Sequence, residues 1–200
     1  VGFNALGLLA TGGANSALGY NALAKTTGGN NTGLGSTALR NTTTGTSNTA
    51  IGTVTLMNNI TGGYNTAIGV SALNNNTTAS YNTAVGNRAM RISTTAANCV
   101  AVGYTALDLL TTGNNNTAVG YAAGNEAVAD EDIITGRYNT LIGYGANAEG
   151  SSTNNEAINQ TVIGANADGV GDNYAVIGDQ STTRVYAAED VGATLYAGSS

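Results

Sequence analysis

Apolar and polar residues recur along this chain with a fixed period, and each period is marked by a glycine that usually follows an apolar pair. These glycines are Gly2, Gly19, Gly35, Gly52, Gly69, Gly86, Gly103 and Gly120, at intervals of 17 residues except for one of 16 before Gly35. Self-similarity at a fixed spacing is typical of a repeat protein whose units stack in one direction. The chain is therefore expected to form a series of stacked coils.

One complete unit spans residues 65–81, NTAIGVSALNNNTTASY, and its residues are numbered here as unit positions 1 to 17. Asn is usual at position 1, Thr at position 2 and Ala at position 3, while position 4 is aliphatic and position 5 is the glycine. Positions 8 and 9 are often Ala-Leu, and positions 10 to 17 are mostly Asn, Thr, Gly and Ser. Each unit thus has an apolar half and a polar half.

Two short strands, at unit positions 1–4 and 6–9, are the elements that this pattern predicts. A helix is disfavoured, because the half that is rich in Asn, Thr and Gly leaves too few helix-forming residues. The glycine between the strands suits a backbone conformation that other residues avoid, and the polar half returns the chain to the next coil. The predicted fold is all-β, a repetitive parallel β-solenoid or β-roll.

Unit positions 3 and 4 are both apolar, although neighbouring residues of a strand point to opposite faces. One of these faces fills the interior of a narrow coil, so the other needs a partner that removes it from water. The simplest partner is the same face on sister chains. The pattern therefore predicts an obligate homo-oligomer with cyclic symmetry, and it leaves the number of chains open.

Equal positions of stacked coils lie about 4.8 Å apart, so Asn at position 1 should form a ladder whose side-chain amides bond to the coils above and below. Thr at position 2 should stack in the same way. Cys99 is the single cysteine and occupies a ladder position. It is expected to be a small ladder residue rather than a reactive thiol.

The period changes along the chain and divides it into three parts. Residues 1–124 hold the regular 17-residue coils, whereas residues 125–178 continue the solenoid with longer insertions and 14-residue coils. Residues 179–200 are expected to form a β cap or a transition to a following domain, with short strands at 183–187 and 193–197. Because the sequence opens within a repeat unit, we expect it to be a segment of a longer polypeptide.

The insertion at residues 125–138, NEAVADEDIITGRY, is acidic and interrupts the regular stack. Binding residues tend to lie on such extra loops, so the insertion supplies the candidates for contact with a receptor. These candidates are Glu126, Asp130, Glu131, Asp132 and Arg137. Carboxylates repeated around a symmetry axis could also hold Ca²⁺, but the spacing of a calcium-binding loop is absent, and a solvated loop is favoured.

Composition excludes several classes of function. The 200 residues include no His, which rules out His-based catalytic triads and His-ligated metal centres. There is no GxxxxGK[ST] phosphate loop and no CxxC pair, so no catalytic residue, metal ligand or cofactor is predicted. The net charge is −6, with +3 in residues 1–125 and −9 in residues 126–200, and no basic patch favours nucleic acid. No apolar run reaches the ~18 residues of a membrane span.

Two further groups of side chains are expected on the surface. Arg88 and Arg91 lie near one level of the stack and would form a solvated basic ring in an oligomer. Tyrosines recur at positions 6 and 17, where stacked rings could bind sugars, although partly buried ladders are the favoured interpretation. They are Tyr20, Tyr104, Tyr121 and Tyr144 at position 6, and Tyr64, Tyr81 and Tyr138 at position 17.

The copies NTAIGVSAL, NTAVGNRAM and NTAVGYAAG, with the 14-residue coils QTVIGANADGVGDN and YAVIGDQSTTRVYA, resemble the head repeats of trimeric autotransporter adhesins. They are still more similar to the NTAVGYxAL repeats of phage tail fibres and related bacterial surface proteins. The resemblance covers about residues 1–180 and implies a homotrimer of left-handed parallel β-rolls. Because the 17-residue coil is longer than the usual coil of adhesin heads, collagen or matrix binding is not carried over.

The expected function is that of a structural and adhesive fibre shaft, and the resemblance favours a non-enzymatic phage tail fibre segment involved in host attachment. Such a segment would be exposed on the virion and would meet a host receptor or glycan. A bacterial cell-surface trimeric adhesin or extracellular filament is the alternative. An ice-binding solenoid is disfavoured because the threonines of position 2 share a strand face with the aliphatic of position 4, taken as core. A polysaccharide-cleaving spike is disfavoured because narrow coils leave little room for a cleft.

Overall fold

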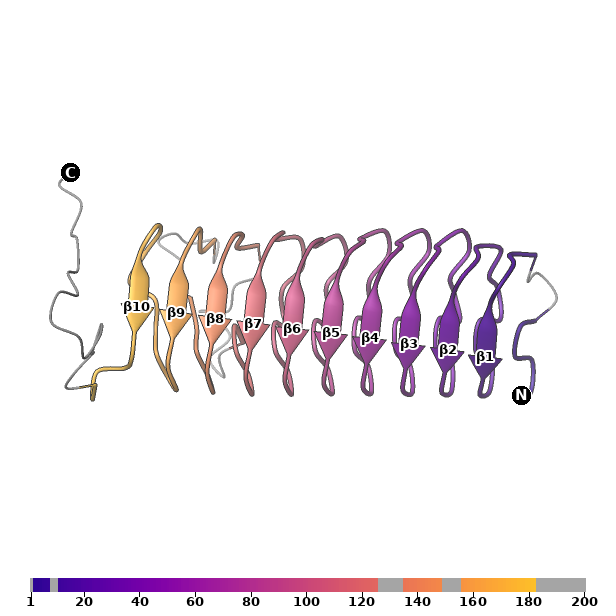
Figure 1. Ribbon diagram of the computed structural model, residues 1–200, viewed down its shortest axis with the longest axis horizontal. Helices are drawn as coiled ribbons and strands as arrows, with labels where there is room; N and C mark the ends of the chain where they lie inside the picture. Colours follow the sequence, from indigo (N-terminus) through magenta and orange to yellow (C-terminus); the bar gives the residue numbers. More distant parts are fainter. Residues whose placement is uncertain (1, 8–10, 126–134, 149–155, 183–200) are drawn as a thin grey trace, which may run out of the picture.

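The computed structural model describes residues 2–7, 11–125, 135–148 and 156–182. Within these ranges there is no helix, and ten three-residue strands lie side by side in one parallel sheet, in the order of the sequence (Figure 1). The strands are β1 (Ser16–Leu18), β2 (Thr32–Leu34), β3 (Thr49–Ile51), β4 (Thr66–Ile68), β5 (Thr83–Val85), β6 (Val100–Val102), β7 (Thr117–Val119), β8 (Thr140–Ile142), β9 (Thr161–Ile163) and β10 (Ala175–Ile177). The predicted all-β parallel solenoid is confirmed, with one strand in each coil.

The strands pair in the register of the sequence repeat, so that equal unit positions are neighbours. In β4 and β5, Thr66 lies beside Thr83 and Ile68 beside Val85. The insertion after residue 125 leaves this register unchanged, because Thr117 of β7 still pairs with Thr140 of β8. The register of the sheet is therefore the same on both sides of the insertion.

The predicted second strand, at unit positions 6–9, is wrong. This arm is a run of turns, because positions 7 and 9 adopt the left-handed conformation, as in Ser71 (φ 59°) and Leu73 (φ 49°). Such values are uncommon for residues other than glycine and interrupt an extended strand. The arm still bonds to the next coil, since the N–H of Leu73 donates to the carbonyl of Ala89 at 3.0 Å. Its apolar pattern reflects burial inside the coil.

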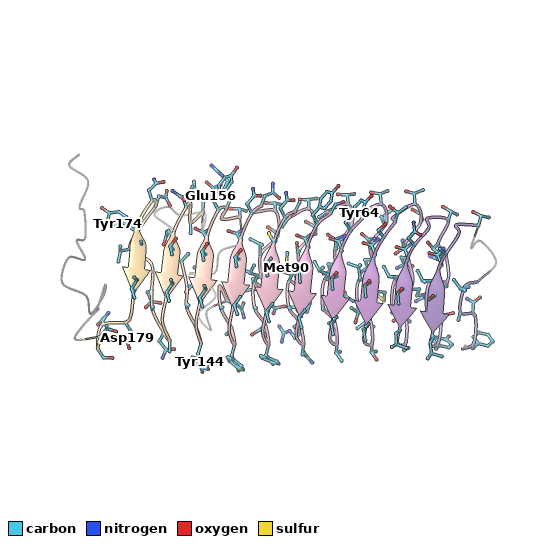
Figure 2. All side chains as sticks on the ribbon, in the orientation of Figure 1. Tyr64, Met90, Tyr144, Glu156, Tyr174 and Asp179 are labelled. Atoms are coloured by element: carbon cyan, nitrogen blue, oxygen red, sulfur yellow. The ribbon has the colours of Figure 1, made fainter. Side chains whose placement is uncertain are left out.

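The core runs along the inside of the solenoid and is filled by unit positions 3, 8 and 9. In one coil these are Ala67, Ala72 and Leu73, each fully buried. In the coils of β1 to β6, small side chains at positions 3 and 8 leave room for one leucine or methionine at position 9, such as Met90, which is labelled in Figure 2. A core this thin repeats without growing, so each coil depends on its neighbours for burial.

In the coils of β8 and β9, larger residues at position 3 compensate for the absence of the core leucine, whereas the coil of β7 has Gly124 at position 9 and still Ala118 at position 3. Position 9 is Asn147 in the coil of β8 and Asp168 in the coil of β9. In the same two coils, position 3 changes from Ala to Leu141 and Val162, both fully buried. The apolar volume is thus moved from the turn arm to the strand, which frees position 9 for polar side chains.

The predicted asparagine ladder is confirmed. The backbone N–H of Asn82 donates to Oδ1 of Asn65 at 3.0 Å, and the same pattern joins Asn65 to Asn48. The Nδ2 group of Asn65 also reaches across its own coil to the carbonyl of Ala79 at 2.9 Å. Each ladder residue therefore ties together two successive coils and the two arms of its own coil.

The glycine of position 5 is required by the backbone. Gly86, which follows β5, has φ of +140°, a conformation that L-residues rarely adopt. A Cβ atom there would also collide with the carbonyl group of Gly103 in the next coil. Coils can stack this closely at the end of the strand only if both residues lack a side chain.

Candidate functional site

The outer face of the sheet carries a continuous row of partly or fully exposed aliphatic side chains from unit position 4. Ile68 in β4 is 37% exposed, and the end members Leu18 and Ile177 reach 51% and 56%. The row comprises Leu18, Leu34, Ile51, Ile68, Val85, Val102, Val119, Ile142, Ile163 and Ile177. Contiguous exposed apolar surface of this kind marks a site of interaction. The outer sheet face is therefore the main candidate functional surface in the described part of the chain.

The two apolar faces of the strand thus have different surroundings. Ala67 at position 3 is buried inside the coil, whereas Ile68 at position 4 points away from it. Position 4 therefore lies outside the interior of its own coil, although it was taken as core in weighing an ice-binding surface. Thr66 at position 2 does share the outer face with Ile68, as expected, and is partly exposed. The earlier reason against an ice-binding surface, that this face is core, is therefore removed.

Aromatic columns flank the outer sheet face at both edges, where Figure 2 shows Tyr64 at one edge and Tyr144 at the other. Tyr64 and Tyr81 of position 17 stack with ring centroids 5.1 Å apart. At position 6, Tyr121 stacks on Tyr104 and on Tyr144, again with 5.1 Å between centroids. The predicted aromatic ladders are confirmed, but these rings are more exposed than expected, at 44–60%.

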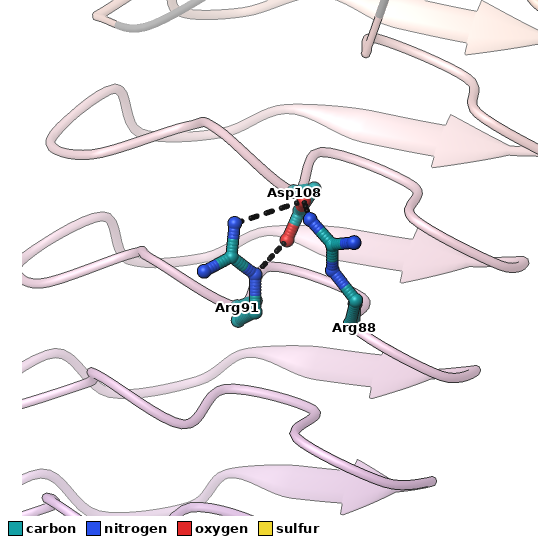
Figure 3. Close-up of polar contacts among 3 residues, drawn as sticks. All are labelled: Arg88, Arg91 and Asp108. Carbon is teal, nitrogen blue, oxygen red and sulfur yellow. Dashed lines mark hydrogen bonds and ion pairs between the residues drawn. The ribbon is translucent and has the colours of Figure 1, made fainter.

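Arg88 and Arg91, predicted to be solvated, are partly exposed but also ion-paired, and the ring that they would form in an oligomer stays a prediction. Both side chains pair with the carboxylate of Asp108, at 2.6 Å from Arg88 Nη2 to Oδ2 and 2.8 Å from Arg91 Nε to Oδ1 (Figure 3). The side chain of Asp108 is only 2% exposed, whereas those of Arg88 and Arg91 are 41% and 31% exposed. Sequence reasoning missed this cluster, although Asp108 stands one 17-residue period after Arg91.

Cys99 occupies the asparagine ladder as predicted. Its backbone N–H donates to Oδ1 of Asn82 at 2.9 Å, and its thiol lies 3.5 Å from the carbonyl oxygen of Gly113. Burial of the side chain raises the pKa of the thiol to about 11, and hydrogen bonds from Asn116 and Asn115 offset only part of that effect. The group is thus held in its protonated, unreactive form.

The candidate receptor-contact residues fall mostly outside the described residues. Glu126, Asp130, Glu131 and Asp132 are the four that lie outside them. Arg137 is described and is exposed, at the point where the chain rejoins the stack. Its N–H donates to the carbonyl of Ala157 and its own carbonyl accepts from Asn159, both at 3.0 Å. The arginine side chain is therefore presented from a fixed backbone.

Within the described ranges, no group of three or more His, Cys, Asp or Glu side chains could hold a metal ion. The same residues contain no helix that is long and apolar enough to cross a membrane. What the described surface offers chemically is thus apolar area, aromatic rings, amides and hydroxyls, which are suited to binding.

The fold and this surface define a class of protein, a single-sheet parallel β-solenoid with an uncovered aliphatic face. Comparison of the chain with models of protein families, with curated proteins and with solved structures found no match.

Proposed function

We propose that this chain is a segment of a homotrimeric, left-handed β-roll fibre shaft, carried on a phage tail fibre and exposed to the medium, where it serves host attachment. The observation that carries the proposal is the aliphatic row of position 4, which continues over all ten strands. A surface that repeats with the coil is best covered by another surface with the same repeat. Sister chains in register supply it, and the fibre they form is rigid by construction.

The number of three chains and the left-handed coil come from the resemblance of the repeats to tail fibres and adhesin heads. The role is mechanical, and no enzymatic step is assigned. The alternative is a trimeric adhesin or filament of a bacterial cell surface, which would use the same shaft. Antibody labelling of virions and of intact cells distinguishes the two locations.

Light scattering on the purified chain tests the assembly. We expect a mass about three times that of the 19.8 kDa chain, with a β-rich circular dichroism spectrum. A variant with Ile68→Asp and Val85→Asp, at the centre of the aliphatic row, should dissociate into folded monomers, because both side chains point away from the coil interior. Thr78→Asp, an exposed residue on the polar return arm, is the matched control and should leave the mass unchanged.

A wild-type chain that is folded and monomeric would contradict the proposal. The exposed rows of threonine and aliphatic side chains would then form the open surface of a single-chain solenoid. Ice-growth inhibition by that monomer would be the next measurement, since the outer sheet face would be open to water.

A further inference from the structure

The lower edge of the sheet in Figure 2, near Tyr144, carries a groove with a volume of about 380 Å³. Its wall includes Tyr121 and Tyr144 from the aromatic column, Asn125 from the coil of β7, and Asn166 and Asp168 from the coil of β9. Asn166 and Asp168 also line a second hollow of about 520 Å³, which extends toward the end of the described stack. The two hollows thus share a polar wall.

The groove also touches Thr105, Ala122 and Gly145 of the coils of β6, β7 and β8, so it runs beside the aromatic column, and the column ends within its length. Tyr121 has a neighbouring ring on both sides, but the residue that follows Tyr144 at position 6 is Ala165. A single methyl group is too small to cover a phenol ring. Tyr144 is 56% exposed, so the outer face of its ring is available at the end of the column. Such a face is flat, apolar and electron-rich, and it attracts polarised C–H groups.

A carboxylate beside this ring is specific to the coil of β9. Position 9 is a buried leucine or methionine in the coils of β1 to β6 and Gly124 in the coil of β7, but it is Asp168 here, with an exposed side chain. Asn166 is exposed as well and has the left-handed backbone of position 7, with φ of +51°. A carboxylate accepts hydrogen bonds from hydroxyl groups, and amides both donate and accept. The volume that was lost from position 9 is regained by Val162, so this substitution leaves the core filled.

We propose that this groove is a carbohydrate-binding site for a neutral pyranose, which stacks on the outer face of Tyr144. Asn125, Asn166 and Asp168 bind its hydroxyl groups. A pyranose has an apolar C–H face and a rim of hydroxyls, which matches one aromatic platform with convergent polar groups in a concave site. No lysine or arginine is among the described residues that line the groove, and Asp168 adds negative charge, so acidic sugars are disfavoured. The site is complete within one chain and does not depend on the proposed fibre.

Saturation-transfer NMR with the intact chain tests the site. The probes are methyl β-D-glucopyranoside, methyl β-D-galactopyranoside, methyl α-D-mannopyranoside and maltotetraose, with sialyllactose as the acidic comparison. We expect at least one neutral probe to bind in the millimolar range, with transfer strongest to the protons of one ring face. Tyr144→Ala should weaken binding about tenfold and Tyr144→Phe only slightly, because stacking needs the ring. Asp168→Asn should weaken binding less than Tyr144→Ala.

Tyr64→Ala is the matched control, since Tyr64 is equally exposed and stacked but lies at the other edge of the sheet, away from the groove. Circular dichroism and light scattering on the same samples show that each variant keeps its fold and its mass. The proposal is overturned if no neutral probe binds, if sialyllactose binds best, or if Tyr64→Ala has the same effect as Tyr144→Ala. None of these outcomes bears on the mass of the assembly, so the fibre proposal is judged separately.

Discussion

The backbone N–H of Asn65 donates a 3.0 Å hydrogen bond to Oδ1 of Asn48, the residue at the same position one coil earlier. The Nδ2 group of Asn65 lies 3.1 Å from the same oxygen. Both side chains are almost fully buried. The buried side-chain amide accepts a hydrogen bond from the backbone of the next coil. It thereby adds to the few backbone hydrogen bonds that strands of only three residues can form between coils.

Asn65→Ala is expected to destabilise the solenoid by about 2–3 kcal/mol. The substitution removes the bonds of Nδ2 and also leaves the backbone N–H of Asn82 without its acceptor, the Oδ1 atom of Asn65. Urea unfolding followed by circular dichroism measures the change. Asn87→Ala, at an exposed asparagine, is the control and should shift the unfolding midpoint little. Equal effects of the two substitutions would show that the ladder does not hold the coils together.

The sequence sufficed to predict this ladder because period and residue type agree. An asparagine that returns every 17 residues in a stacked coil must face its own copies, whatever the exact path of the chain between them. The second arm was predicted wrongly for the opposite reason. The adjacent apolar residues Ala72 and Leu73 do not distinguish a strand from a turn that buries the same side chains, and no residue type in the sequence indicates the left-handed φ of Leu73.

Cys99→Asn is expected to stabilise the protein by about 1 kcal/mol, because the asparagine would restore the ladder between Asn82 and Asn116. In the wild type, the thiol should react with a disulfide reagent much more slowly in the folded protein than in urea, since it is buried and protonated. Rapid labelling of the native protein near neutral pH would contradict the buried position.

The stability of the wild type relative to Cys99→Asn should fall as the pH rises through the alkaline range. The folded-state pKa of the thiol, about 11, lies above the ordinary value of 9.0, so folding favours the protonated thiol. The contribution of this thiol is therefore complete below about pH 9 and is lost as the pH rises toward 11. The loss is at most about 2–3 kcal/mol. Urea unfolding of the two proteins between neutral pH and pH 11 measures this loss. A difference in unfolding free energy that stays constant over this range would contradict the prediction.

The cluster of Arg88, Arg91 and Asp108 should respond asymmetrically to charge removal. Asp108→Asn leaves two arginines that already reach water, so it should cost less than about 1.5 kcal/mol. Arg88→Ala with Arg91→Ala leaves a carboxylate that is 2% exposed without the two cations that now contact it, and should cost about 3 kcal/mol. Adding Asp108→Asn to that double variant should recover most of the loss. Equal costs for the two changes would show that Asp108 is effectively solvated.

The candidate sites were less accessible to sequence reasoning than the fold. The adjacent apolar positions 3 and 4 predict a second apolar face on the strand, but they do not tell which of the two lines the interior of the coil. The groove at Tyr144 was missed, because its wall combines residues of different coils. Tyr144 and Asp168 are 24 residues apart in the sequence, and only the stacking of coils shows that both line one groove.

Gly86→Ala is expected to be among the most damaging single substitutions in the regular coils. The new alanine would have to adopt φ of +140°, and its methyl group would collide with the carbonyl group of Gly103. That carbonyl group cannot move away without displacing the next coil. Backbone strain and collision together should cost about 3 kcal/mol or more. Gly13→Ala is the control, because a Cβ atom there has open space around it, and it should change the thermal midpoint little. If the two substitutions proved equally mild, adjacent coils would have to move apart easily, and a stack built on contact between glycines could not be rigid.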